Sequence, residues 1–185
     1  MPVVLGLAVG GLTSVGQTYL DRPFAAFCNS ASAWLVAPFL VGTLIPTRRS
    51  AATAGLVTCV LELVGYYITS RARGFAAGDA ILAFWTLCAL VGGPLFGVAG
   101  HTWRTGSRKL RGLGGTALPA AFLAEGLWLY HHELHYESTA ILWLAVAATL
   151  LVPSWRPVEF RWLPLTLASG LVAEMIVSVA YRQSF

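Results

Sequence analysis

Three glutamates stand inside otherwise apolar stretches of this sequence. Glu62 lies in Leu61-Glu-Leu-Val-Gly-Tyr-Tyr67, Glu125 in Ala124-Glu-Gly-Leu-Trp-Leu-Tyr130, and Glu174 in Ala173-Glu-Met-Ile-Val177. A protonated carboxyl group can donate a proton, and an ionised one can hold a cation. The three residues are therefore candidates for acid–base catalysis or for cation binding.

Aromatic and amide side chains accompany these glutamates. Tyr66 follows Glu62 by four residues and Trp128 follows Glu125 by three, so each aromatic residue is expected to share a helical face with its glutamate. Packing, capping or membrane-interface roles remain open for the other candidate binding residues, which are Gln17, Asn29, Trp34, Trp85 and Trp143. Tyr67, Tyr130 and Tyr181 are expected in an interface belt.

The composition places these residues in a membrane protein. The chain is 57% hydrophobic and 11% charged, whereas soluble domains carry about 25% charged residues. Its 185 residues allow one domain, residues 1–185, with no separate soluble part. We therefore expect an all-α bundle that is embedded in a cell membrane and surrounded by lipid.

Apolar segments that approach the roughly 20 residues of a membrane span predict about seven transmembrane helices. The first lacks the features of a cleaved signal peptide, so we expect it to be retained. The second contains Pro38 and ends at Pro46, and could be broken or re-entrant. The predicted helices are 2–20, 29–46, 51–70, 79–101, 115–131, 138–153 and 162–182.

The basic residues predict the orientation. With a cytoplasmic N-terminus, the inner loops hold eight basic residues and one acidic residue, and the outer segments hold four of each. Basic residues favour the cytoplasmic side. Arg104 to Arg111 is expected to be a basic inner loop near lipid headgroups, so the positive charge gives no reason to expect nucleic-acid binding.

A threefold repeat is visible, with each glutamate preceded by a tryptophan. Trp34, Trp85 and Trp143 precede their glutamates by 28, 40 and 31 residues. In the predicted topology, all three glutamates lie about 15–18 Å from the inner helix ends, with the tryptophans about 8 Å below the outer surface. The chain is thus expected to form three repeated helical hairpins after one N-terminal helix, although apolar helices also resemble one another by chance.

A carboxyl group at this depth costs about 2.5–3.5 kcal/mol, and no basic residue is predicted near it. Burial disfavours the charged form, so some of the glutamates are expected to be protonated. They could act chemically, or they could hydrogen-bond neighbouring helices as packing contacts. Three glutamates at one depth favour the chemical role.

Other motifs give weaker signals. His131 and His135 are spaced for one helical face, but the outer segment 131–137 lacks the zinc-protease pattern and is typical of a solvated helix end. Cys28, Cys59 and Cys88 are scattered and are expected to be buried thiols. We expect no metal and no cofactor.

The helix number, the short length and the buried acids, notably Glu62 and Glu174, resemble the small membrane-integral terpene cyclases. That resemblance implies that intramembrane acids protonate an apolar isoprenoid-type substrate and start its cyclisation. Glu125 has no counterpart in those proteins. Aromatic faces would stabilise the resulting carbocations.

A second hypothesis is a transporter or a substrate-binding membrane subunit for a small cationic molecule. Carboxyl and aromatic groups suit such a ligand equally well, and substrate-binding subunits of energy-coupling-factor importers have a similar length with six helices. Three motifs also resemble uncharacterised small membrane proteins of actinobacterial type: Asn29-Ser-Ala-Ser-Ala-Trp34, Gly92-Gly-Pro-Leu-Phe-Gly97 and Ala124-Glu-Gly126.

The predicted topology can be tested with reporters fused to the two ends. The basic excess predicts a cytoplasmic N-terminus and a C-terminus outside. A periplasm-active reporter at the C-terminus should therefore give signal, and a cytoplasm-active one should not. A C-terminal reporter that is active only in the cytoplasm would favour six spans over seven.

Overall fold

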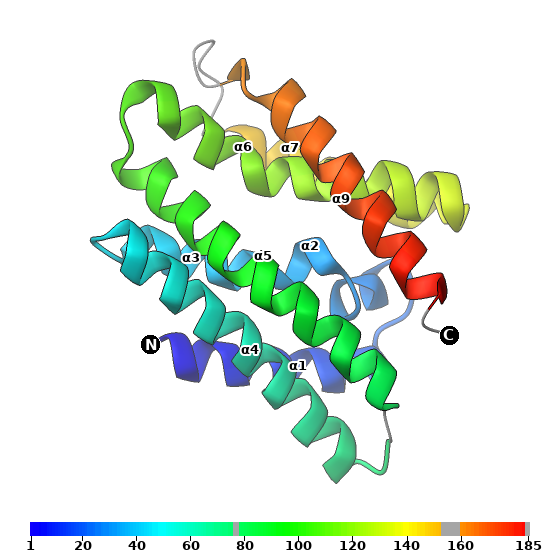
Figure 1. Ribbon diagram of the computed structural model, residues 1–185. Coiled ribbons are helices and arrows are strands. Elements are labelled where there is room, and N and C mark those ends of the chain that lie inside the picture. Colours follow the sequence, from blue (N-terminus) through cyan, green and yellow to red (C-terminus); the bar gives the residue numbers. More distant parts are fainter. Residues whose placement is uncertain (76–77, 153–159, 184–185) are drawn as a thin grey trace.

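The computed structural model describes residues 1–75, 78–152 and 160–183, and the regular structure in these ranges is helical (Figure 1). This confirms the all-α prediction. The helices are α1 (Pro2–Tyr19), η1 (Phe24–Cys28), α2 (Ala31–Trp34), α3 (Val36–Leu44), α4 (Arg48–Ala72), α5 (Asp79–Thr105), α6 (Arg108–Glu125), η2 (Gly126–Glu133), α7 (Glu137–Leu151) and α9 (Leu163–Gln183).

The predicted basic loop from Arg104 to Arg111 is wrong. Helix α5 continues to Thr105 and α6 already begins at Arg108, so only two residues separate them. Basic side chains are compatible with helix ends because they extend into the surroundings from there, and their charge gave no signal of a loop. Two residues assigned to another predicted inner loop, Arg156 and Glu159, lie outside the described residues.

The second predicted helix is broken. It forms the short helices α2 and α3, which meet at Leu35. Pro38 explains the break, because proline donates no backbone hydrogen bond and its ring crowds the carbonyl four residues earlier, here that of Trp34. Together, Ala31–Leu44 form an apolar stretch of about 21 Å at 1.5 Å per residue. That length falls short of the hydrocarbon core, which is about 30 Å thick.

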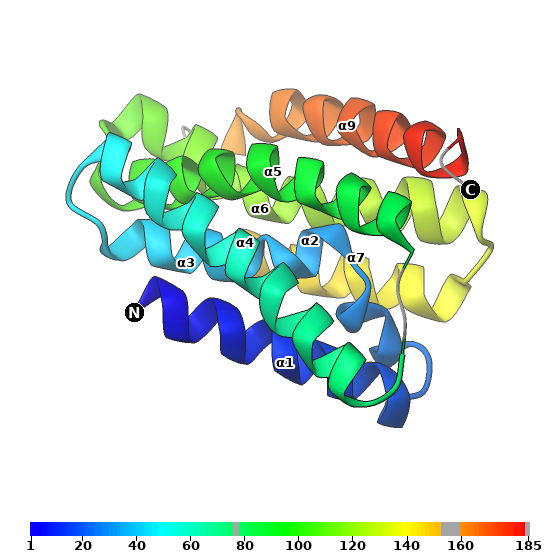
Figure 2. The same ribbon diagram turned by 60° about the horizontal axis from the view of Figure 1, so that its bottom comes forward.

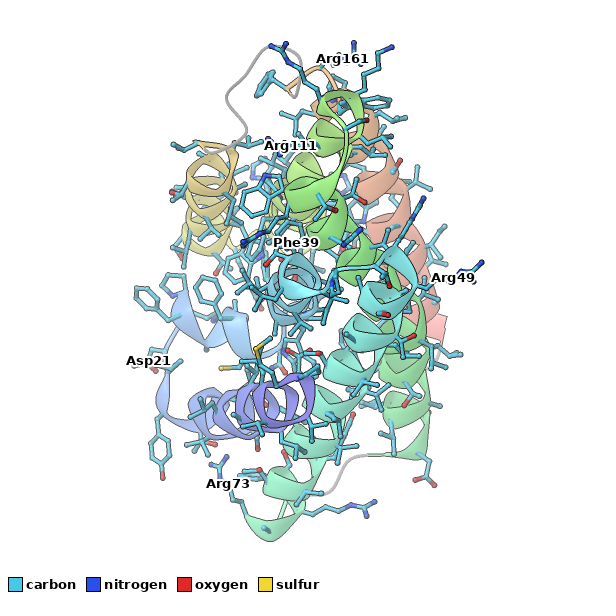
Figure 3. The ribbon with its side chains drawn as sticks, turned by 90° about the vertical axis from the view of Figure 1, so that its left-hand side faces the viewer. Asp21, Phe39, Arg49, Arg73, Arg111 and Arg161 are labelled. Carbon is cyan, nitrogen blue, oxygen red and sulfur yellow. The ribbon has the colours of Figure 1, made fainter. Side chains whose placement is uncertain are left out.

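Three of the described helices are long and apolar enough to cross a membrane: Arg48–Ala72, Asp79–Thr105 and most of α9. The outward surface of α5 suits lipid, since Leu87, Val91 and Leu95 are all exposed. Figure 3 shows Arg49 and Arg161 extending away from the bundle, whereas Phe39 lies among the helices. Membrane association therefore has support from both length and surface chemistry.

The helices pack in two groups joined by α5. Helix α4 lies against α1 and α5, whereas α6 lies between α7 and α9 (Figures 1 and 2). Helix α5 contacts both α4 and α6. The predicted hairpins are therefore not equivalent: α3 packs on α4 and α5 on α6, but α7 and α9 both pack chiefly on α6.

Backbones of α1 and α4 approach closely at Gly10. A Cβ atom there would lie 1.9 Å from the carbonyl oxygen of Glu62, and one at Gly6 would lie 2.5 Å from that of Thr58. Gly6 and Gly10 are four residues apart and so lie on one face of α1, a spacing that allows close helix contact. Glu62 is therefore held on a backbone that α1 fixes in place.

This contact predicts that Gly10→Ala will destabilise the protein by about 1–3 kcal/mol, the usual cost of overpacking. Gly11→Ala is the matched control, because its nearest neighbour is the Thr69 hydroxyl at 3.3 Å, which can move. Reversible unfolding in detergent measures both. Equal stability of the two variants would show that α1 does not fix the backbone of Glu62.

Candidate functional site

Glu125 lies at the end of α6 and accepts three hydrogen bonds. Its Oε2 accepts one from the Ser30 hydroxyl at 2.8 Å and one from the Ser32 backbone N–H at 2.9 Å. Its Oε1 accepts one from the Tyr130 hydroxyl at 3.4 Å. The side chain is 1% exposed. Three converging donors suit a carboxylate, which only accepts hydrogen bonds when ionised.

Ser30 and Ser32 reach Glu125 because they begin α2. Ser30 is the N-cap of that helix, and its oxygen accepts a hydrogen bond from the Ala33 N–H at 3.1 Å. This capping leaves the hydroxyl proton of Ser30 free for Glu125. The indole of Trp143, on α7, donates to the Ser32 hydroxyl at 3.0 Å. One polar network thus joins α2, α6 and α7.

Aromatic rings pack around this network at Trp143. Trp143 is fully buried and stacks on Phe27 at 4.5 Å between ring centroids. The Tyr130 ring meets it edge-on at 4.8 Å, and that of Phe122 lies at 6.0 Å. The predicted belt position of Tyr130 is wrong, because this residue is 5% exposed and bonds to Glu125.

A π-helix decides which aromatic residue meets Glu125. The chain changes from α to π winding at Gly126, and the wider turn lets Leu134 N–H donate to Leu129 O, five residues back. Tyr130, five residues after Glu125, consequently contacts the carboxyl group, whereas Trp128 had been predicted to share a helical face with Glu125. The Trp128 ring stacks on His132 at 4.7 Å.

Glu62 has the opposite environment. It is completely buried, and neither carboxyl oxygen has a hydrogen-bond partner among the described residues. The Cys59 thiol, one turn earlier on α4, is the polar group nearest to this carboxyl group that the electrostatics of Glu62 register. A buried polar group without a partner costs about 1–3 kcal/mol. Such a group is expected where function requires it.

Aromatic residues surround the same part of α4. Trp34 and Trp85 pack with Tyr67 against the buried cluster of Cys59, Leu63 and Ala89. The rings of Trp34 and Tyr66 lie 5.6 Å apart. Cys59, the neighbour of Glu62, therefore belongs to an aromatic-lined cluster formed by α2, α4 and α5.

Glu174 lies on α9 and is 9% exposed. Its carboxyl group is near enough to those of Glu125 and Glu133 to be repelled by both. The structure therefore brings Glu125 and Glu174 together. Glu62 has a separate set of neighbours around Cys59.

The other predicted binding residues form no hydrogen bond with any of the three glutamates among the described residues. Tyr66 donates a hydrogen bond to the exposed Gln17, across the contact of α1 with α4. Asn29 is exposed at the end of η1. The half-buried Trp34 donates to the Cys28 carbonyl at 3.2 Å. Of the three predicted layer tryptophans, Trp143 alone is fully buried.

Sequence reasoning missed Ser30 and Ser32 as partners of Glu125. Their spacing before an apolar helix signals a cap, but the hydrogen bonds to Glu125 join residues more than 90 positions apart. Among the described residues, no group of three His, Cys, Asp or Glu side chains is arranged for a metal. His131 pairs instead with Glu137 at 3.0 Å, and both are exposed.

The chain matches the family of unknown function DUF6518 over residues 1–184, and it belongs to that family. No curated protein and no solved structure matches it.

The two environments predict opposite effects of the same substitution. Glu62→Met removes an unpartnered buried carboxyl group and should raise the free energy of unfolding by about 1–3 kcal/mol. Glu125→Met leaves three donors unpaired and should lower it by about 1–3 kcal/mol or more. Unfolding in detergent compares the two variants with wild type. If Glu62→Met destabilises the protein as strongly as Glu125→Met, then Glu62 has a structural partner.

Proposed function

We propose that this member of the DUF6518 family is a multi-pass membrane protein in which Glu62 protonates an apolar isoprenoid-type molecule and starts its cyclisation. The observation that carries the proposal is the completely buried carboxyl group of Glu62, which has no hydrogen-bond partner among the described residues. An uncharged acid in an apolar site keeps its proton where an exposed carboxyl group would have lost it, so the proton is available for transfer to a bound substrate.

The location of Glu62 fits an apolar substrate. It lies on α4, one of the helices that are long and apolar enough to cross a membrane. Apolar molecules concentrate in the bilayer and would reach the bundle from its lipid-facing side. The half-buried Tyr66 lies one turn after Glu62 on α4, and its ring contacts that of the half-buried Trp34 at the end of α2. We infer that these rings must separate to admit a substrate.

The proposed reaction is an isomerisation that begins with an epoxide. The Glu62 proton goes to the epoxide oxygen while a carbon–oxygen bond breaks. A neighbouring double bond supplies the electron pair for a new carbon–carbon bond, and the positive charge moves along the chain. Loss of a proton from carbon then forms a double bond and returns a proton to the Glu62 carboxylate. The faces of Trp34, Tyr66 and Trp85 would stabilise the cations by cation–π attraction.

Glu125 has a supporting role in this proposal. Its three donors fix it between α2 and α6, so it holds the helix that carries Trp34. In the cyclisation, Glu125 therefore acts through the position of α2.

A second candidate function is the binding or transport of a small cation. The observation that favours it is that Glu174 lies within electrostatic reach of both Glu125 and Glu133. The described counter-charge is Arg182, which pairs with Glu133. A cationic ligand would relieve the repulsion among these groups.

Glu62→Gln tests the proposed reaction. The amide keeps the size of the side chain but has no acidic proton, so conversion of an epoxidised prenyl substrate by detergent-solubilised protein should fall by about a hundredfold or more. Glu137→Gln, at an exposed glutamate paired with His131, is the control and should keep full activity. Full activity of Glu62→Gln would reject Glu62 as the acid. No conversion by wild type, with saturable binding of an organic cation, would favour the second function.

A further inference from the structure

One face of α9 is polar although the helix is otherwise apolar. Glu174, Ser178 and Arg182 follow one another at intervals of four residues and so line a single face. Glu174 and Ser178 are 9% and 8% exposed. Arg182 is exposed, and its guanidinium donates a hydrogen bond to Glu133 at the end of η2. This pairing directs the polar face of α9 toward η2.

Polar groups of α6 and η2 lie opposite this polar strip, which consists of Glu174, Ser178 and Arg182. Glu133 has a side chain that is 15% exposed, whereas Glu125 is 1% exposed. Tyr130 stands beside Glu125, to which it donates a hydrogen bond, and it also lies within electrostatic reach of Glu174. Exposure thus falls in steps from Glu133 through Glu174 to Glu125.

Ser178 differs from the other hydroxyl residues of α9. Ser169 donates to the Leu165 carbonyl at 2.9 Å, and Thr166 donates to that of Trp162 at 3.1 Å, as serine and threonine within helices usually do. The Ser178 hydroxyl is buried and has no partner among the described residues. It lies between Glu174 and Arg182 on the strip. A hydroxyl group can donate and accept at once, which suits the relay of a proton.

The exposed end of this strip, at Arg182, is surrounded by polar side chains. Glu133 and Arg182 form an ion pair there, and the exposed pair of His131 and Glu137 lies on the neighbouring turns. Tyr181 stands beside Arg182 on α9, and its ring packs on Phe84 at 5.6 Å. Cys88, on α5, also lies near Glu174. The polar face of α9 therefore has an exposed ion pair at one end and buried acidic groups, Glu174 and the neighbouring Glu125, at the other.

We propose that Glu133, Ser178 and Glu174 form a proton-access path that connects water at the Arg182 end of the bundle with the buried pair of Glu125 and Tyr130. The π-helix η2 is part of this path, because it presents Tyr130 to Glu125 and ends at Glu133. Such π-helical segments occur frequently at functional sites.

This path is independent of the proposed acid Glu62. The groups near Glu62 belong to α4 and to the cluster around Cys59, and the path ends at Glu125. A failure of the cyclisation assay would therefore leave the path untouched, and the path is tested without any substrate.

Infrared spectroscopy after a rapid pH jump provides the test, with full-length protein in lipid nanodiscs. Carboxyl signals that appear with the jump are assigned by their loss in Glu174→Gln and Glu125→Gln. Ser178→Ala removes the relay hydroxyl and should lower the rate at which the assigned signal appears by about tenfold. The reason is that the transition state for proton transfer loses roughly one hydrogen bond. Ser169→Ala deletes an exposed hydroxyl from the same helix and should leave the rate unchanged.

Two further variants keep the test decisive. Ser178→Thr retains the hydroxyl group and should respond at the wild-type rate, and Glu133→Gln at the exposed end of the strip should be slow like Ser178→Ala. The path is refuted if Ser178→Ala and Glu133→Gln both respond at the wild-type rate. It is also refuted if Glu174→Gln removes none of the carboxyl signal, because Glu174 then exchanges no proton with water.

Discussion

A carboxyl group inside an apolar bundle must either find hydrogen-bond donors or remain uncharged, because its ionised form is very poorly solvated there. Glu125 and Glu62 represent these two solutions. Glu125 draws donors from Ser30, Ser32 and Tyr130, and is fixed by them. Glu62 has none among the described residues. Much of the arrangement of the helices can be understood from this difference.

The network around Glu125 explains how the short helix α2 is held in place. Alone, four residues would not form a stable helix. Ser30 and Ser32 bond to Glu125, and Trp143 donates to Ser32 from α7, so the start of α2 is tied to two other helices. The other group of helices, which contains α1 and α4, is held by close backbone contact between Gly10 of α1 and Glu62 of α4. The polar contacts hold one group together, while the close packing of the other surrounds an acid without fixing its carboxyl oxygens.

The sequence predicted features that are local. The three glutamates were identifiable because a charged residue in an apolar helix is conspicuous, and Pro38 marked the break near Leu35.

Features that depend on tertiary contacts or on unusual winding were not predictable. The bond from Ser30 to Glu125 spans 95 residues, and no local pattern reveals such a pairing. Trp128 was expected beside Glu125 because α-helical spacing was assumed where the chain is π-helical, and Tyr130 was assigned to an interface belt from its residue type. The grouping of α7 and α9 around α6 likewise depends on packing that a sequence repeat does not specify.

Infrared difference spectroscopy can determine directly whether Glu62 is an uncharged acid. The spectrum of wild type at neutral pH minus that of Glu62→Gln isolates the signal of this one side chain. We expect the carbonyl band of a protonated carboxylic acid, at the high frequency typical of a group without hydrogen bonds. A carboxylate band in its place would show that Glu62 is ionised and would rule it out as the proton donor, because an ionised Glu62 would require a partner that the described residues do not supply.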